Sequence, residues 1–452
     1  MTDLGAAIAH YHDLLAGGLA AECQAQLETH QRQRGLAFGE RMVCTVLRPR
    51  FLTSEQYRLI RQAIRALMPA FGKAHALALR DASFRAQFRL ADWEEKLVAL
   101  PKPYSASSPT ARMDMFYDLS TGALMCTEYN AETPAGIGYH DALVELMLDL
   151  PVMRAFERAY EVNPLFPTRR HVLSALLHSY AEWGGREHPR IAILDWEGVP
   201  TYSEFVQFQH YFEAHGFACV IADPRACTYA NGKLIVGGAP VHIIYKRVLL
   251  SELVEREGLD SPVVRAVVDN AVCMVNPFHC KVLHRKTSFA VLSDEANAHL
   301  FTADERRAIQ QHIPWTRVVA ERFTQHNGAR VDLLPFVAAR KDQFVLKPAD
   351  EYGGKGIVLG WTVSQAEWEA ALKHALETPT IVQQRVVVPS EPYPTYADGQ
   401  FQIAERMLDT NPYIWGDTYA SGCLTRLSTA ALLNVTAGGG STVPTFVIES
   451  RA

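Results

Sequence analysis

Two strand-forming segments, residues 111–117 and 123–130, restrict the possible folds of this chain more than any other stretch. The residues between them, "DLSTG", make a five-residue turn that ends in glycine, and this pattern predicts a β-hairpin. We expect Tyr117 to pair with Ala123 across the turn. Because side chains alternate along a strand, the even-numbered positions of both strands then share one face. The polar members of that face are Arg112, Asp114, Glu128 and Asn130.

This polar face has the composition of a magnesium site. Two carboxylates and an amide oxygen form an oxygen-only ligand set, which Mg²⁺ prefers when phosphates complete its coordination. An arginine beside them suits an anionic group in transfer. Taken alone, the hairpin favours a second interpretation, a solvated surface with an Arg–Glu pair across the strands, which contributes little to stability.

Length, charge and cysteine usage narrow the class of protein. A chain of 452 residues exceeds the size at which one core keeps growing, which predicts two or three domains. The net charge of −5 is spread without a basic stripe, so we expect small-molecule partners and no nucleic acid. The eight cysteines show no Cys-x-x-Cys pair, so neither a disulfide framework nor a zinc ribbon is indicated. No charged leader and no stretch of 18 apolar residues occurs, which predicts a cytoplasmic protein without a membrane partner.

Hydrophobic periodicity divides the rest of the chain into helical and mixed regions. Helical spacing predicts an amphipathic helix in residues 1–35 and a second in residues 52–71, where Thr53 and Gln56 form a capping box. From residue 190 the order is strand, helix, strand, strand, which indicates a small α/β domain. That domain lacks the Gly-x-Gly-x-x-Gly turn of a dinucleotide site. Two more helices are expected in residues 141–160 and 169–183.

Three further segments have the composition of a nucleotide site. Residues 343–361 predict two strands joined by a glycine-rich loop, with Lys347 at a strand end; consecutive glycines let backbone amides approach phosphates. Residues 382–389 predict a strand whose backbone suits a purine edge, and residues 275–295 predict one helix carrying Lys281 and Lys286. Taken singly, each segment also fits an ordinary structure: a hairpin turn, an edge strand or a surface lysine.

Together these segments resemble the circularly permuted ATP-grasp proteins of type 2, a group that includes the synthetase domain of glutathionylspermidine synthetase. The likeness runs from about residue 105 to the C-terminus. It rests on an ordered series: Arg-x-Asp, Glu-x-Asn-x-x-x-Pro, Asn-Pro, Lys, Lys-Pro with a glycine-rich loop, and Gln-Gln-Arg-Val. In an unpermuted ATP-grasp the metal-binding strands follow the lysines, whereas here they precede them by more than 150 residues.

The resemblance implies an α/β (α+β) fold, namely a circularly permuted ATP-grasp with an inserted small Rossmann-like pre-ATP-grasp domain and N-terminal helices. The expected divisions are 1–105 for the N-terminal helical region, 106–150 for the metal-binding hairpin, 151–275 for a helical linker and the Rossmann-like domain, 276–395 for the nucleotide-binding subdomain, and 396–452 for the C-terminal part of the ATP-grasp core.

The resemblance also implies ATP and Mg²⁺ as cofactors and assigns residues to them. Asp114, Glu128 and Asn130 match the metal ligands. Arg112 matches the arginine beside the transferred phosphate, and Arg426 is similar to an arginine that completes the site of this branch.

The nucleotide itself is expected to contact two lysines, the glycine-rich loop and a hinge strand. The matching positions are Lys286, Lys347, Tyr352, Gly353, Gly354, Lys355, Gly356, Gln383, Gln384, Arg385 and Val386. A second glycine-rich stretch, residues 438–440, matches the end of the type 2 branch. The chain departs from the family pattern at Gln383–Gln384, where many members have Gln-Glu, and at Val443, a place often held by an acidic residue.

The reaction implied by this resemblance is an ADP-forming ligation. A substrate carboxylate attacks the γ-phosphate of ATP to give an acyl phosphate, and an amine then displaces phosphate to give an amide. Two other functions stay open: an ATP-binding protein that has lost ligation and acts as a sensor or scaffold, and a small-molecule kinase that stops at the phosphorylated product. The acceptor pocket is expected within the 150–275 region, which carries no motif for a particular substrate.

Overall fold

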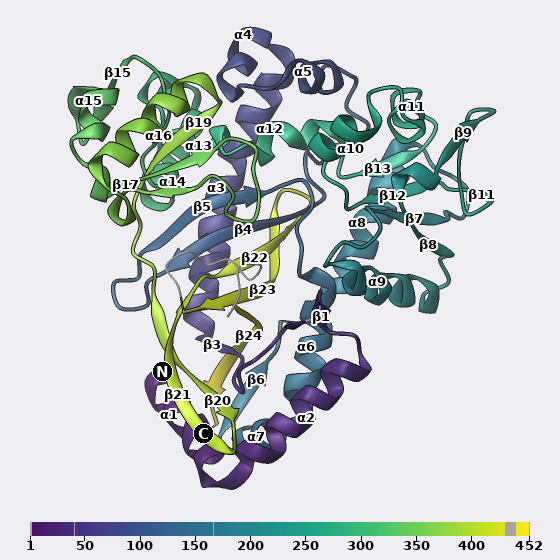
Figure 1. Cartoon of the computed structure of the whole chain (residues 1–452). Helices are drawn as coiled ribbons and strands as arrows, with labels where there is room; N and C mark the ends of the chain where they lie inside the picture. Colours follow the sequence, from purple (N-terminus) through teal and green to yellow (C-terminus); the bar gives the residue numbers. More distant parts are fainter. Residues whose placement is uncertain (1, 40, 166, 430–439, 452) are drawn as a thin grey trace.

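The computed structural model describes residues 2–39, 41–165, 167–429 and 440–451 of the chain. In these residues the strands assemble into one large mixed sheet, one parallel sheet, one antiparallel sheet and three smaller sheets. Helices cover the three main sheets (Figure 1). The α/β class that the sequence predicts is therefore confirmed.

The large sheet collects strands from the N-terminal, middle and C-terminal parts of the chain. Within the described residues it has nine strands, in the order β20-β21-β23-β22-β4-β5, with β24 pairing β23, β3 and β6. The strands are β3 (Arg50–Thr53), β4 (Thr110–Tyr117), β5 (Leu124–Asn130), β6 (Tyr160–Asn163), β20 (Ser390–Ala397), β21 (Gln400–Leu408), β22 (Asn411–Trp415), β23 (Tyr419–Ser428) and β24 (Ser441–Ser450).

Helix α3 (Ser54–Arg80) packs against this sheet. Its first turn carries the capping box predicted from Thr53 and Gln56, with both reciprocal hydrogen bonds present. Its apolar face enters the same buried core as β4 and β5. One such contact joins the rings of Phe71 and Tyr129, whose centroids lie 5.1 Å apart. The long helix therefore supports the hairpin from its apolar side.

The N-terminal helices share a second core with the lower strands of the large sheet, in the lower part of Figure 1. They are α1 (Leu4–Leu14) and α2 (Ala20–Gln33), joined by a π-helical turn at Leu15–Leu19, and they pack with α6 (Ile137–Asp149) and α7 (Pro151–Phe156). The single helices expected for residues 1–35 and 141–160 are therefore each divided in two. Gly18, at φ 118°, bends the first, and the extended Leu150 before Pro151 interrupts the second.

The parallel sheet has the order β13-β12-β7-β8. Its strands are β7 (Ile191–Leu194), β8 (Cys219–Ala222), β12 (Ile243–Lys246) and β13 (Cys273–Val275), and every pairing is parallel. Its helices are α8 (Thr168–Trp183), α9 (Tyr202–Ala214), α10 (Leu250–Glu257) and α11 (Pro262–Val268). Alternate residues of β7 enter two different cores, which is typical of a Rossmann-like sheet covered on both faces.

The antiparallel sheet has the order β14-β19-β17-β18 and lies at the upper left of Figure 1. Its strands are β14 (Thr316–Val318), β17 (Phe344–Pro348), β18 (Val358–Leu359) and β19 (Thr380–Gln384). Helices α15 (Leu333–Ala338) and α16 (Gln365–Glu377) share its apolar core. Strands β17 and β18 pair antiparallel across the glycine-rich loop, as the sequence predicts.

The predicted hairpin forms from β4 and β5, but its expected register is wrong. Tyr117 pairs with Leu124 rather than with Ala123, and a β-bulge lies between the pairs of Asp114 and Met115. A bulge adds one unpaired residue to one strand, and an alternating pattern of polar and apolar residues does not reveal it. The pairing of every residue beyond the bulge is therefore shifted.

The shift changes which side chains face each other. Asp114 lies opposite Glu128, and Arg112 lies opposite Asn130. Cys126, which straight alternation would place on the polar face, is instead fully buried in the apolar core beneath the hairpin. The bulge thus separates a polar end of the hairpin from an apolar end.

The single helix expected for residues 275–295 is also wrong. The segment begins at the end of β13, continues as helices η4 (Phe278–Cys280) and α12 (Lys281–His284), and resumes as α13 (Thr287–Ser293). Arg285 interrupts it with extended backbone angles of φ −63° and ψ 132°. Its guanidinium binds Glu94, at 2.5 Å, in α5 (Asp92–Val98), a tertiary contact that local periodicity does not reveal.

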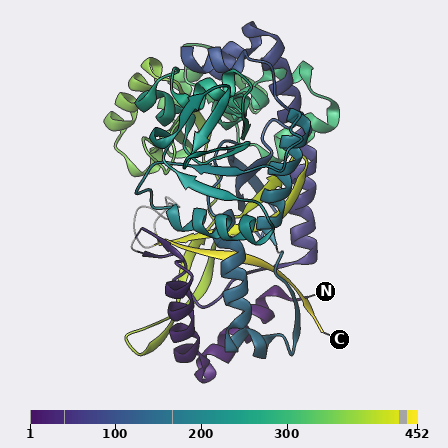
Figure 2. The same cartoon turned by 90° about the vertical axis from the view of Figure 1, so that its right-hand side faces the viewer.

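The two ends of the described chain lie side by side (Figures 1 and 2). The backbone N–H of Ser450 donates to Thr2 Oγ1 at 2.9 Å. Adjacent termini at a surface are the geometry that circular permutation requires. None of the helices in the described part of the chain combines the length and apolar character needed to cross a bilayer.

Candidate functional site

Asp114 lies at the centre of the polar end of the hairpin and is buried. Arg112, on the same strand, donates from Nε to Asp114 Oδ1 at 2.7 Å and from Nη2 to Asp114 Oδ2 at 3.1 Å. Nη1 of Arg112 donates to the carbonyl of Ala135 at 2.7 Å. The guanidinium of Arg112 is thus held by the Asp114 carboxylate and by the backbone just before α6.

Arg426, on β23, reaches the same carboxylate from 312 residues further along the chain. Its Nη2 donates to Asp114 Oδ2 at 2.7 Å, and its Nε donates to Asp409 Oδ2 at 2.6 Å. Burial favours the neutral form of Asp114, but the charges of Arg112 and Arg426 outweigh this effect and lower its pKa to about 2. Asp114 is therefore ionised at neutral pH.

Lys286, just before α13, pairs with the second carboxylate of the hairpin. Its Nζ lies 2.8 Å from Glu128 Oε1 and donates to the backbone carbonyl of Glu351 at 2.6 Å. Burial would raise the pKa of Glu128, but the Lys286 ammonium outweighs burial and lowers it. Lys286 therefore joins the hairpin to the start of the glycine-rich loop.

Lys347, near the end of β17, approaches the hairpin from the antiparallel sheet. Its Nζ donates to Gln383 Oε1 at 2.7 Å and to the carbonyl of Thr127 at 3.3 Å. Burial lowers the pKa of this ammonium to about 8, although the charge of Glu128 acts in the opposite direction. Gln383 donates to Thr316 Oγ1 at 3.0 Å and is itself buried, so its side chain orients the lysine instead of facing solvent.

The glycine-rich loop between β17 and β18 adopts backbone angles that favour glycine. Gly353, Gly354 and Gly356 have φ values of 64°, 77° and 68°. A Cβ atom at Gly356 would lie 2.7 Å from Pro348 Cγ. At the tip, the hydroxyl of Tyr352 donates to Glu252 Oε1 in α10 at 3.0 Å, which ties the loop to the helices of the parallel sheet.

The loop also holds Lys355, and a hinge segment follows β19. Lys355 Nζ lies 4.6 Å from the ring centroid of Tyr352. The amides of Gln384 and Arg385 donate to the carbonyls of Trp315 and Gln343. The Arg385 guanidinium lies 4.1 Å from the ring centroid of Trp361, which is half-buried. The backbone of Val386 forms no hydrogen bond with other backbone groups of the described residues.

The polar end of the hairpin presents oxygen donors of the kind that a hard metal ion takes. Clusters of three or more His, Cys, Asp or Glu side chains that would hold a metal are absent from the described residues. The hairpin offers two carboxylates and the amide of Asn130. The Nδ2 atom of this amide is buried and has no hydrogen-bond partner among the described residues. Rotation of that amide would present its oxygen instead. This set fits Mg²⁺ that takes its other ligands from phosphates or water.

Asp409 and three members of a buried ion cluster belong to the site's surroundings but were not predicted. Asp409 is buried and bound to Arg426. It follows the apolar residues Met407 and Leu408, and a charged residue in such a position indicates a buried polar contact. The three cluster members are Glu132, Lys281 and Asp350, and Lys246 also binds Glu132. The two pairs of Lys281 cross 149 and 69 residues of sequence, so local patterns do not reveal them. Gly438 and Gly439, also predicted, lie outside the described residues.

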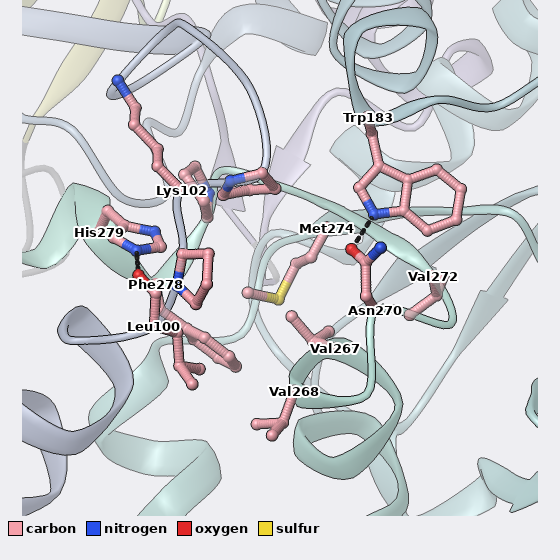
Figure 3. Close-up of a pocket in the computed structure, with 13 residues that line it drawn as sticks. Leu100, Lys102, Trp183, Val267, Val268, Asn270, Val272, Met274, Phe278 and His279 are labelled. Carbon is pink, nitrogen blue, oxygen red and sulfur yellow. Dashed lines mark hydrogen bonds between the residues drawn. The ribbon is translucent and has the colours of Figure 1, made fainter.

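A pocket of about 360 Å³ lies beside β13, at the edge of the parallel sheet (Figure 3). Leu100, Val267, Met274 and Phe278 give it a mostly apolar lining. The Lys102 ammonium points away from the pocket and binds the Ser105 carbonyl. The lining therefore lacks the chemistry of a phosphate site, in contrast to the polar end of the hairpin.

Comparison with known proteins gives a family and a fold. A model of the circularly permuted ATP-grasp type 2 family matches residues 88–428. Among curated proteins, an "ATP-grasp enzyme ankG" of Aspergillus thermomutatus is 24% identical over 182 residues, 38% of this chain. That match spans only 36% of the relative's own length.

Among solved structures, a glutathione synthetase-like effector (GSS30) from Globodera pallida in its apo form resembles the whole chain. The TM-score is 0.56 with 12% sequence identity, and the alignment covers 95% of this chain and 94% of that protein. At this identity the likeness concerns the fold alone. With the family match, it confirms the circularly permuted ATP-grasp fold expected from the motif order.

Proposed function

The chain belongs to the circularly permuted ATP-grasp family of type 2, and from this premise we propose that it is an ADP-forming ligase that joins a carboxylate to an amine. In the proposed reaction the substrate carboxylate takes the γ-phosphate of ATP, and the amine then displaces phosphate from the acyl phosphate. The products are an amide, ADP and phosphate. Both substrates are small molecules.

One observation carries this proposal: opposite charges from four separate segments meet at one end of the hairpin. Asp114 and Glu128 face each other there. Lys286 binds Glu128, and Lys347 binds the carbonyl of Thr127 in the hairpin. Arg426 binds Asp114. A structural salt bridge needs only two such groups. Alternating anions and cations around one point suit a triphosphate and its counter-ion, because phosphoryl transfer asks chiefly for positioning and charge neutralisation.

Each group has a distinct proposed task. Asp114, Glu128 and Asn130 hold Mg²⁺, which neutralises phosphate oxygens when bound. Lys286 and Lys347 bind the remaining phosphate charge.

The arginines and the loop act on the reacting end of the nucleotide. Arg112 and Arg426 stabilise charge on the transferring group; Arg426 has a side chain that is 24% exposed, and Arg112 also holds Asp114 in place. The glycine-rich loop, residues 353–356, covers the phosphates and excludes water, which would hydrolyse an acyl phosphate. The amine loses its proton to phosphate or solvent in this scheme. The backbone of Val386 contacts the adenine.

The test measures ADP released from Mg-ATP in the presence of mixed carboxylates and amines. Glu128→Gln keeps the size of the side chain and removes the negative charge of one metal ligand, so we expect ADP release to fall by at least a hundredfold, about 2.7 kcal/mol of transition-state stabilisation. Glu145→Gln is the matched control, because Glu145 forms surface pairs with Arg34 and Arg169. Unchanged ADP release in folded Glu128→Gln would overturn the proposal.

One observation favours a second candidate. Gln384 stands where many members of the family have glutamate, and its neighbour Gln383 is occupied with orienting Lys347. An altered hinge suits an ATP-binding sensor or scaffold without ligation. Tight binding of Mg-ATP with no ADP release in the same screen would support that function. A stable phosphorylated product that forms without any amine would instead indicate a kinase.

A further inference from the structure

A buried ion cluster connects the end of the hairpin to the glycine-rich loop. Its central carboxylate is Glu132, which follows Asn130 by two positions and is 1% exposed. Glu132 accepts from Lys246 Nζ at 3.2 Å, from Lys281 Nζ at 3.1 Å and from the amide of Leu250 at 2.6 Å. One carboxylate therefore joins the hairpin to β12, to α10 and to α12.

Lys281 extends this connection to the loop. Its Nζ also binds Asp350 Oδ1 at 2.7 Å, and the Lys281 side chain is 1% exposed. A buried ammonium must be paired, because an isolated charge at this depth is strongly disfavoured. Lys281 is paired with Glu132 and Asp350 at hydrogen-bond distance and lies 3.8 Å from Glu94, so its ammonium joins the end of the hairpin to the residues that precede the loop.

The same segment holds the loop at two more points. The amide of Lys286 donates to the carbonyl of Ala349 at 2.9 Å, and Lys286 Nζ donates to the carbonyl of Glu351 at 2.6 Å. Three consecutive residues, 349–351, are thus attached to the segment 281–286. The three glycines that follow have no side chains to pack, so the direction in which the loop leaves β17 depends on these attachments.

We propose that Lys281 is a positioning residue, which holds the glycine-rich loop over the polar end of the hairpin through a Glu132–Lys281–Asp350 bridge. The proposal rests on the nucleotide site proposed above and extends it to three residues that touch no nucleotide. Lys281 lies beneath the loop and acts through it. The bridge favours the loop position that encloses the phosphates, so it strengthens binding of a triphosphate and leaves binding of a monophosphate unchanged.

Asp350→Asn tests the bridge with the smallest change to the fold. It removes one anion at the loop end, where the side chain is 17% exposed, and leaves the Lys281–Glu132 pair in place. Asp342→Asn is the matched control, because Asp342 pairs with Lys341 at 2.8 Å but is 69% exposed. Kd is measured calorimetrically with Mg-AMP-PNP and with AMP, and hydrogen exchange is followed in peptides covering residues 349–358.

We expect Asp350→Asn to raise the Kd for AMP-PNP about tenfold, within the range typical of coupling between sites, and to leave the Kd for AMP unchanged. Loop peptides should exchange faster in the variant even without nucleotide. A general loss of stability would weaken the binding of both ligands alike. The ratio of the two Kd values therefore separates an effect on loop position from an effect on folding. Lys281→Arg should keep the preference for AMP-PNP over AMP close to that of the wild type, and Lys281→Met should lose most of this preference.

The outcomes also separate this inference from the proposed function. If the wild-type chain binds no AMP-PNP but the loop still exchanges faster in Asp350→Asn, the bridge stands and the nucleotide site is wrong. If the wild type binds AMP-PNP while Asp350→Asn changes neither the Kd ratio nor loop exchange, the positioning role is wrong. Equal effects of Asp350→Asn and Asp342→Asn would also contradict it.

Discussion

At the scale of single residues, the two carboxylates of the hairpin differ in how they are held. Asp114 is enclosed by two guanidinium groups, whereas the Glu128 side chain is 26% exposed and binds one ammonium. Removing one partner of a buried, hydrogen-bonded charge leaves the others unpaired, which costs far more than removing a partner near solvent. The same type of substitution should therefore have unequal effects on folding.

Asp114→Asn is expected to lower the free energy of unfolding by about 3 kcal/mol, because Arg112 and Arg426 lose the charge that compensates them. Glu128→Gln should lower it by less than about 1 kcal/mol. Urea titration of both variants at neutral pH measures the difference. Equal losses in the two variants would show that the arginines do not depend on Asp114.

Lys347 allows a prediction about protons. Its pKa is lowered to about 8 by burial, with a smaller lowering by Lys286 and opposing effects of Glu128 and Asp114. At pH 8.5 the Lys347 side chain of the free protein is then largely neutral. A bound triphosphate would favour its charged form. We expect proton uptake when AMP-PNP binds at pH 8.5, and little uptake at pH 7, where the ammonium is already charged.

Calorimetry in two buffers of different ionisation enthalpy measures this proton uptake. In Lys347→Arg the side chain stays charged at both pH values, so the uptake at pH 8.5 should disappear. The affinity of the wild-type chain should also fall above pH 8, where the ammonium must first be regained. Uptake of the same size in Lys347→Arg would assign the proton to another group.

At the scale of elements, the glycine-rich loop depends on backbone angles that other residues adopt reluctantly. Gly356→Ala adds strain at φ 68° and a contact of 2.7 Å with Pro348 Cγ. We expect this variant to bind Mg-AMP-PNP at least tenfold more weakly, since left-handed strain costs about 1–3 kcal/mol and the contact adds to it. Binding of AMP, measured in the same titrations, should be unaffected.

The matched control for the loop is Gly399→Ala. Gly399 joins β20 and β21 at φ 75°, and no atom lies within 4 Å of its added Cβ. It carries the same backbone strain without the collision and far from the hairpin. If Gly399→Ala weakens AMP-PNP as much as Gly356→Ala, the effect reflects general destabilisation and not the loop.

Elements with local signals were predictable from sequence. The capping box at Thr53, the helix that ends at Gly184, and the strand–loop–strand unit around Lys347 all depend on residues within one or two turns of each other. The bulge beside Asp114 and the break at Arg285 depend on contacts with distant segments, so periodicity alone gave a wrong register and a wrong helix.

The candidate site shows the same division. Arg112, Asp114, Glu128 and the two lysines were found because their order along the chain matches that of one family, and the structure brings them together. Glu132 and Asp350 act through partners in remote segments, and each has the sequence environment of an ordinary polar residue, whereas Asp409 binds Arg426 on a neighbouring strand. Their roles follow only from the folded arrangement.

At the scale of the whole molecule, the order of the motifs is explained by how the large sheet is assembled. β4 and β5 carry the positions that we propose bind Mg²⁺, β23 brings Arg426, and β24 joins strands from near both ends of the chain. Because β3 pairs in parallel with β24, the N-terminal segment completes the sheet that the C-terminal strands begin. Because strands from both ends of the chain complete the sheet, the site forms only when the entire chain is folded. A change in the global free energy of unfolding should therefore also affect the site.

Buried histidines are the groups that make the whole fold sensitive to mild acid. Burial lowers the pKa of His75 to about 3 and those of His12 and His284 to about 4, with the charges of Lys102, Arg48 and Lys281 adding to the effect. The unfolded chain binds a proton at each near pH 6.5. Below that pH the unfolded state binds more protons than the folded state, so stability falls as pH falls.

We expect the free energy of unfolding to decrease from pH 6.5 to pH 5, by up to about 1.4 kcal/mol per pH unit for each fully coupled histidine. Asp195 acts in the opposite direction, because burial raises its pKa to about 6 and the folded state then gains a proton first. Ordinary carboxylates titrate mainly below this range. Urea titrations at intervals of half a pH unit measure the slope.

Two histidine variants assign the slope to buried sites. His75→Gln removes a ring that lies between the Ser107 hydroxyl and the His279 carbonyl, so the slope between pH 6.5 and pH 5 should decrease. His178→Gln is the control, because the His178 side chain is 71% exposed. A slope unchanged by His75→Gln, or a stability that does not vary over this range, would mean that the buried rings are protonated in the folded state and that the packing around α3 tolerates their charge.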